Sequence, residues 1–85
     1  MAQSNHDAYR VVCHWDGESQ MWYVAESTVP GLATEAVTPD QMLAKLRIMI
    51  PELLQANGQV QDDMDVPIDL LCQQHESVHV NGRRR

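Results

Sequence analysis

The chain has 85 residues and a mass of 9.6 kDa, which suits one small domain and leaves no room for a second core. It is 44% hydrophobic and 21% charged, a composition that excludes an intrinsically disordered chain. No apolar run is long enough to predict a membrane span, and the polar N-terminus lacks the pattern of a signal peptide. We therefore expect a cytoplasmic protein.

Charge is distributed unevenly along the sequence. Residues 1–82 hold all twelve carboxylates and three of the six Lys and Arg residues, which gives them a formal charge of −9. The other three bases are the last three residues, Arg83, Arg84 and Arg85. An acidic body repels nucleic-acid phosphates and suits either a basic partner or simple solubility. We expect a single domain over residues 1–85, with a core of about residues 8–80 and flexible tails at residues 1–7 and 81–85.

Two strands joined by a turn are predicted near the N-terminus. Polar and apolar residues alternate over residues 9–15, and one side of this strand carries Tyr9, Val11, Cys13 and Trp15. Asp16 and Gly17 then favour a reversal, because Gly adopts positive φ at no steric cost. Residues 21–26 are rich in aromatic and β-branched side chains and predict the second strand of an antiparallel hairpin.

A third strand and a helix are predicted next. Pro30 and Gly31 are typical of the two central positions of a tight turn, and the extended strand after them covers residues 32–37. Thr38 is the expected N-cap, with Pro39 in the first helical position and Gln41 completing a capping box. One apolar stripe then repeats at helical spacing and comprises Met42, Leu43, Leu46, Met49, Ile50, Leu53 and Leu54.

The end of the helix and the last strand follow from local signals. Pro51 predicts a kink or a restart, because proline has no N–H to donate within the helix. Asn57 and Gly58 are typical of a helix C-terminus. Residues 66–72 alternate again and predict a fourth strand, which residues 77–80 either extend or follow as a short extra strand. The expected fold is α+β, with the order β-β-β-α-β and one helix on one face of an antiparallel sheet.

A single helix covers only one face of such a sheet. Whichever register holds, half of the side chains at residues 22–24 point to the uncovered face. A second copy could cover it, so we predict a homodimer or a larger oligomer. The candidate partner-binding residues are Trp22, Tyr23, Val24, Glu26, Glu35, Ile48 and Asp69.

The sequence contains no recognisable catalytic constellation. Cys13 and Cys72 fall in apolar strand segments, which favours free buried thiols over a zinc site or a disulfide. His75 and His79 share a strand side but lie too far apart along an extended chain to bind one ion. We therefore predict a protein that is not an enzyme, with no catalytic residue, metal site or cofactor.

The chain resembles the short HicB-like proteins, and among them a compact bacterial group of unknown function. The residues that carry this resemblance span about Val11 to Leu71 and comprise Trp15–Glu18, Trp22–Ser27, Val29–Ala36, Ile50–Leu54 and Asn57–Gly58. The resemblance implies a strand-strand-strand-helix-strand fold, a truncated relative of the RNase H fold without its active site. It also implies an antitoxin that oligomerises and neutralises HicA, a small basic toxin that cleaves mRNA.

Two departures from the HicB pattern narrow what the resemblance implies. Full antitoxins usually carry a C-terminal DNA-binding domain, whereas this sequence ends soon after the fourth strand, so operator binding is not implied. Thr28 also stands where relatives often have Asp before the Pro-Gly turn. The leading hypothesis is a protein-interaction module that resembles an antitoxin. The alternatives are a nucleic-acid-binding accessory domain that uses the Arg83–Arg85 tail and a vestigial RNase H-like, metal-dependent nuclease.

Overall fold

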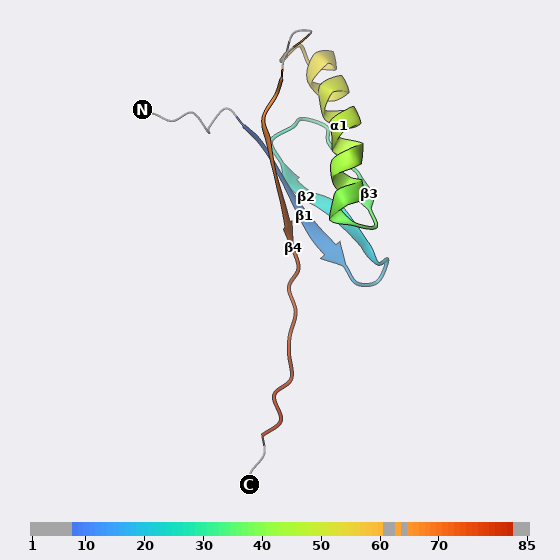
Figure 1. The fold of residues 1–85 in the computed structure, drawn as a ribbon, viewed down its shortest axis with the longest axis vertical. Helices are drawn as coiled ribbons and strands as arrows, with labels where there is room; N and C mark the ends of the chain where they lie inside the picture. The colour runs from blue at the N-terminus through green and yellow to red at the C-terminus, as the bar shows by residue number, and fades with distance from the viewer. Residues whose placement is uncertain (1–7, 61–62, 64, 83–85) are drawn as a thin grey trace, which may run out of the picture.

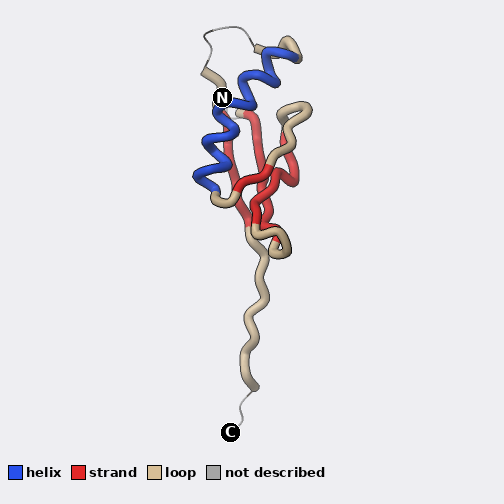
Figure 2. The backbone as a smooth tube through the Cα atoms, turned by 90° about the vertical axis from the view of Figure 1, so that its right-hand side faces the viewer, coloured by secondary structure: helices blue, strands red, loops and turns tan. Residues whose placement is uncertain are grey.

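The computed structural model describes residues 8–60, 63 and 65–82, which form one sheet with one helix packed on it (Figure 1). The sheet order is β3-β2-β1-β4, and the helix lies on one side of the strands (Figure 2). In chain order the elements are β1 (Tyr9–Asp16), β2 (Met21–Ser27), β3 (Glu35–Ala36), α1 (Pro39–Ala56) and β4 (Ile68–Gln73). The predicted α+β class and element order are confirmed.

The sheet is mixed, so the prediction of a wholly antiparallel sheet is wrong. β1 pairs with β2 and β2 with β3 in antiparallel fashion, but β4 runs parallel to β1, with Tyr9 opposite Ile68 and Cys13 opposite Cys72. The reason is the helix between β3 and β4. A helix returns the chain to the end of the sheet where the preceding strand began, so the next strand runs in the same direction. β4 therefore lies parallel to both β3 and β1.

The core lies between α1 and the sheet. The helix contributes Met42, Leu46, Ile50 and Leu54, spaced four residues apart, and all four are at most 3% exposed. Val11 and Cys13 of β1 face them and are fully buried. The predicted stripe is confirmed at these four positions, because side chains at this spacing lie on one side of a helix. Its other three members, Leu43, Met49 and Leu53, are half-buried.

Both ends of α1 follow the sequence signals. The Thr38 hydroxyl accepts a hydrogen bond from the backbone N–H of Gln41 at 3.0 Å, as expected of an N-cap. At the other end Asn57 is the C-cap, and Gly58 follows with a φ of +70°. The helix continues through Pro51 to Ala56 without restarting, so the last turns pack on the core with the rest.

The connections differ from prediction in detail. Gly31 has the expected positive φ of +79°, but in the first hairpin the left-handed residue is Gln20, at +60°, and not Gly17. That loop is instead held by the Asp16 carboxylate, which accepts hydrogen bonds from the Glu18 N–H and the Ser19 hydroxyl. β3 is two residues long where six were predicted, since only Glu35 and Ala36 pair with β2 before the helix begins.

The chain beyond β4 leaves the body of the molecule. Residues 74–82 belong to no helix or strand, so the strand predicted at 77–80 is absent from this part of the described chain. The segment runs away from the sheet (Figures 1 and 2), and the longest dimension of the molecule is 66 Å. Of the tails predicted at residues 1–7 and 81–85, residues 1–7 and 83–85 lie outside the described residues.

Candidate functional site

The face of the sheet opposite α1 is the candidate binding surface, here called the open face. Because side chains alternate along a strand, the residues that do not point to the core point to this face. They come from all four strands and comprise Arg10, Val12, His14, Tyr23, Glu26, Glu35, Asp69 and Leu71. The open face thus combines apolar, aromatic and charged side chains on one surface.

A bulge in β2 directs Glu26 to the open face. The pairing of β1 with β2 shifts between Val12 and Cys13, which lie opposite Glu26 and Val24, so Ala25 is an extra residue. By strict alternation Glu26 would share the side of Val24, which packs against the core. The inserted residue moves Glu26 to the opposite side, and bulges commonly redirect a side chain in this way.

The centre of the open face is apolar and aromatic. Val12 is only 5% exposed although the helix covers the other side, and Leu71 lies directly opposite it on β4. His14 and Tyr23 face each other across β1 and β2, with ring centroids 6.2 Å apart in an edge-on arrangement. Beside these rings lies a shallow hollow of about 580 Å³, to which Gln73 also contributes.

Carboxylates surround this apolar centre. Glu35 lies on β3, Glu26 on β2 and Asp69 on β4, and all three side chains are exposed. The only basic side chain among the described open-face residues is Arg10, which is paired opposite Asp69 in the sheet. The open face therefore carries more negative than positive charge, as the sequence as a whole does.

The structure divides the seven predicted partner-binding residues among three places. Tyr23, Glu26, Glu35 and Asp69 lie together on the open face. Trp22 and Val24 point the other way and pack against the core beside the helix. Ile48 is 66% exposed on α1, outside the buried stripe of the helix.

Sequence reasoning missed four members of the open face. Arg10, Val12, His14 and Leu71 were not among the predicted partner-binding residues, although each is one residue away from a predicted core residue in an alternating strand. The alternation of Tyr9, Val11, Cys13 and Trp15 contained the signal, since the residues between them must occupy the other face.

The two cysteines meet on the helix-covered side. Cys13 and Cys72 lie opposite each other on the parallel strands β1 and β4, and both are free thiols. Cys13 is buried, as predicted, whereas Cys72 is only half-buried. Burial raises the pKa of the Cys13 thiol to about 11, and the neighbouring Cys72 thiol adds to the increase. Cys13 is therefore protonated at neutral pH and has little nucleophilic character.

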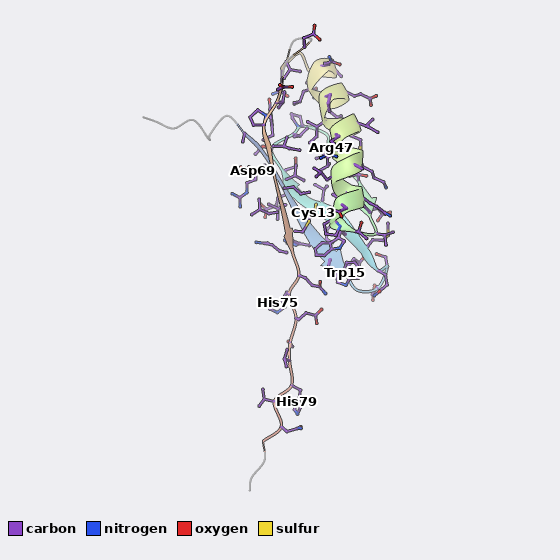
Figure 3. The ribbon with its side chains drawn as sticks, in the orientation of Figure 1. Cys13, Trp15, Arg47, Asp69, His75 and His79 are labelled. Carbon is purple, nitrogen blue, oxygen red and sulfur yellow. The ribbon has the colours of Figure 1, made fainter. Side chains whose placement is uncertain are left out.

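The described acids and histidines do not gather into a metal centre. Within residues 8–60, 63 and 65–82, no group of three or more His, Cys, Asp or Glu side chains is close enough to hold an ion. Glu26 and Asp69 share the open face but lie on strands separated by β1. His75 and His79 lie along the extended segment after β4 (Figure 3). In the same described residues, no helix has the length and apolar character needed to cross a membrane.

Comparison with known proteins places this fold in a family. The family model for a domain of unknown function, DUF1902, matches residues 8–81. The chain belongs to the DUF1902 family. It is also similar to the crystal structure of hypothetical protein TTHA1013 from the extremely thermophilic bacterium Thermus thermophilus. The two share 40% sequence identity with a TM-score of 0.62, over 86% of this chain and 99% of the other. No curated protein matches the sequence significantly.

Proposed function

We infer that this DUF1902 protein is a non-enzymatic interaction module that binds a small basic protein on the open face. The observation that carries this proposal is the composition of that face: an apolar centre around Val12, His14 and Tyr23, bordered by exposed carboxylates. Protein-binding surfaces commonly have a desolvated centre with aromatic side chains and a charged rim. The carboxylates attract a basic partner and orient its approach.

The resemblance to HicB-like antitoxins indicates which kind of partner to test. A HicA-like toxin is small and basic because it binds RNA, and a cover of opposite charge keeps it from its substrate. The formal charge of −9 on residues 1–82 supports such a pairing. The function is then neutralisation of an mRNA-cleaving toxin by direct contact.

The test is inhibition of a HicA-like toxin encoded beside this protein in its native genome. Purified chain should bind the toxin and suppress its cleavage of mRNA in vitro. The double variant Glu26→Lys with Asp69→Lys should weaken binding by roughly tenfold or more, because it reverses two charges at the rim. Glu52→Lys, at an exposed position on α1, is the matched control and should bind as the unmodified chain does.

Salt dependence separates this mechanism from others. Binding through exposed charges weakens as ionic strength rises, whereas a purely apolar contact does not. If no basic protein is retained by the full chain from native-host extract at low salt, and the neighbouring toxin stays active, the proposal is wrong.

A further inference from the structure

Residues 74–82, here called the arm, are exposed throughout. They continue directly from β4 and leave the body of the molecule (Figures 1 and 3). Val78 is 85% exposed and Val80 is 80% exposed, the two highest values among the large hydrophobic side chains of the described chain. Nine extended residues span about 30 Å, which is long enough to line a whole strand.

The sheet offers one long unpaired edge. β4 is an outer strand whose partner in the sheet is β1, so its other side presents six residues of backbone that no described strand covers. Such an edge is a template for the addition of another strand. A groove of about 480 Å³ lies between α1 and the start of β4, and its apolar lining includes Leu43, Ile50, Val66 and Ile68.

The arm cannot reach the edge of its own β4 without a reversal of the chain. A tight hairpin needs residues such as Gly, Asn, Asp or Pro, and residues 74–76 are Gln, His and Glu. The chain accordingly runs straight on after Gln73 (Figure 1). A second copy presents the same edge with no turn required.

The apolar pattern of the arm matches that of β4. Ile68, Leu70 and Cys72 occupy alternate positions and pack toward α1. Val78 and Val80 continue the same two-residue period, so an extended arm places them on the same side as those residues. Residues opposite each other in an antiparallel pair also share a face, so both valines would point to the helix side of the partner's sheet.

We propose that two copies of the chain exchange arms, each arm adding as an antiparallel fifth strand to the β4 edge of the other copy. Val78 then lies opposite Cys72 of the other copy, and Val80 lies opposite its Leu70, beside the apolar groove. The arrangement is self-complementary, as a two-fold dimer requires, with the symmetry axis next to His75. Both unpaired edges and all four exposed valines are covered by the same contact.

Charge favours the same direction of pairing. An antiparallel arm leads the end of the chain toward the start of the partner's β4. Arg83, Arg84 and Arg85 follow the arm in sequence, and Asp63 and Asp65 precede β4. An antiparallel arm therefore directs the chain toward these aspartates, whereas a parallel arm would direct it away from them.

A disulfide tests the register directly. Opposite residues of an antiparallel pair have Cα atoms about 4.5–5.5 Å apart, within the range that a disulfide bridges. Full-length chain carrying Val78→Cys should form a covalent dimer under mild oxidation, and peptide mapping should join the introduced thiol to Cys72. Adding Cys72→Ser should abolish that dimer. His79→Cys, one residue along and on the opposite side of the arm, is the matched control and should yield much less of it.

Sedimentation of the full chain provides an independent measurement. The unmodified protein should be dimeric at high micromolar concentration, and Val78→Asp with Val80→Asp should raise the dissociation constant by roughly tenfold or more. Ile48→Asp, which changes a comparably exposed side chain on α1, should leave it unchanged, as should Glu26→Lys on the open face. A monomeric unmodified chain, or a covalent dimer that forms equally with His79→Cys, would overturn the proposal.

Discussion

The two faces of the sheet are built from the same strands but have opposite roles. On the helix-covered face, Val11 and Cys13 are fully buried among the side chains of α1. On the open face, Arg10 is exposed and His14 is only half-buried. The helix accounts for this difference, because its side chains cover one face of the sheet and leave the other face open to solvent.

Val12 is the informative exception to this division. It lies on the open face yet is only 5% exposed, and it lines a small hollow together with Arg10 and Glu26. Its opposite neighbour Leu71 is half-buried. The open face therefore has a small apolar centre that is already largely removed from water. A partner would obtain most of its binding free energy from contacts with the half-exposed rings and the charged rim.

The largest expected difference between the faces is in core packing. Leu46→Ala removes a fully buried side chain that contacts the sheet, and it should lower the free energy of unfolding by about 3 kcal/mol. Leu71→Ala on the open face should cost about 1 kcal/mol, since that side chain is already partly in water. Denaturant unfolding of both variants measures the comparison. Equal losses would mean that the open face is covered in solution.

The buried thiol predicts a distinct alkaline dependence for the helix-covered face. Because the pKa of Cys13 is raised from 9.0 to about 11, the folded state disfavours the thiolate. Its contribution to stability is present in full below pH 9 and is lost as the pH rises toward 11. The free energy of unfolding of the unmodified chain should therefore fall more steeply over that interval than that of Cys13→Ala. If the free energy of unfolding of the two proteins falls equally with pH, the Cys13 thiol is accessible to water in the folded state.

The helix that covers one face of the sheet begins at the N-cap Thr38. Thr38→Ala removes the hydroxyl that accepts the Gln41 N–H and should cost about 1 kcal/mol. Thr38→Ser keeps the acceptor and is the matched control. Thermal unfolding followed by circular dichroism measures both variants. An unchanged unfolding midpoint for Thr38→Ala would mean that packing, and not the cap, stabilises the N-terminus of α1.

Much of this fold could be predicted because it is encoded locally. The cap at Thr38, the turn at Gly31 and the helical stripe each depend on residues a few positions apart. The direction of β4 was predicted wrongly although the helix before it contained the answer. The strand predicted at residues 77–80 has the right alternation, but a strand also needs a neighbour to pair with, and the described chain supplies none.

The candidate site was harder to predict than the fold. Which of Trp22 and Tyr23 faces a partner depends on register, and register is set by pairing with distant residues. The bulge at Ala25 then reverses the side on which Glu26 lies, a change that simple alternation cannot reveal. The sequence therefore predicted that one face of the sheet is uncovered, but it identified only some of the residues on that face.

The smallest effect is expected at Ile48, on the outer side of α1. Its side chain is 66% exposed and lies outside the buried stripe, so Ile48→Lys should change the free energy of unfolding by less than about 0.5 kcal/mol. It should also leave binding of a basic partner unchanged, because the helix and the open face are on opposite sides of the sheet.

Tyr23→Ala, by contrast, should weaken binding while destabilising the fold by only about 0.5–1 kcal/mol through the lost ring contact with His14. If Ile48→Lys abolishes binding and Tyr23→Ala does not, the partner binds the helix side, and the open face has another role.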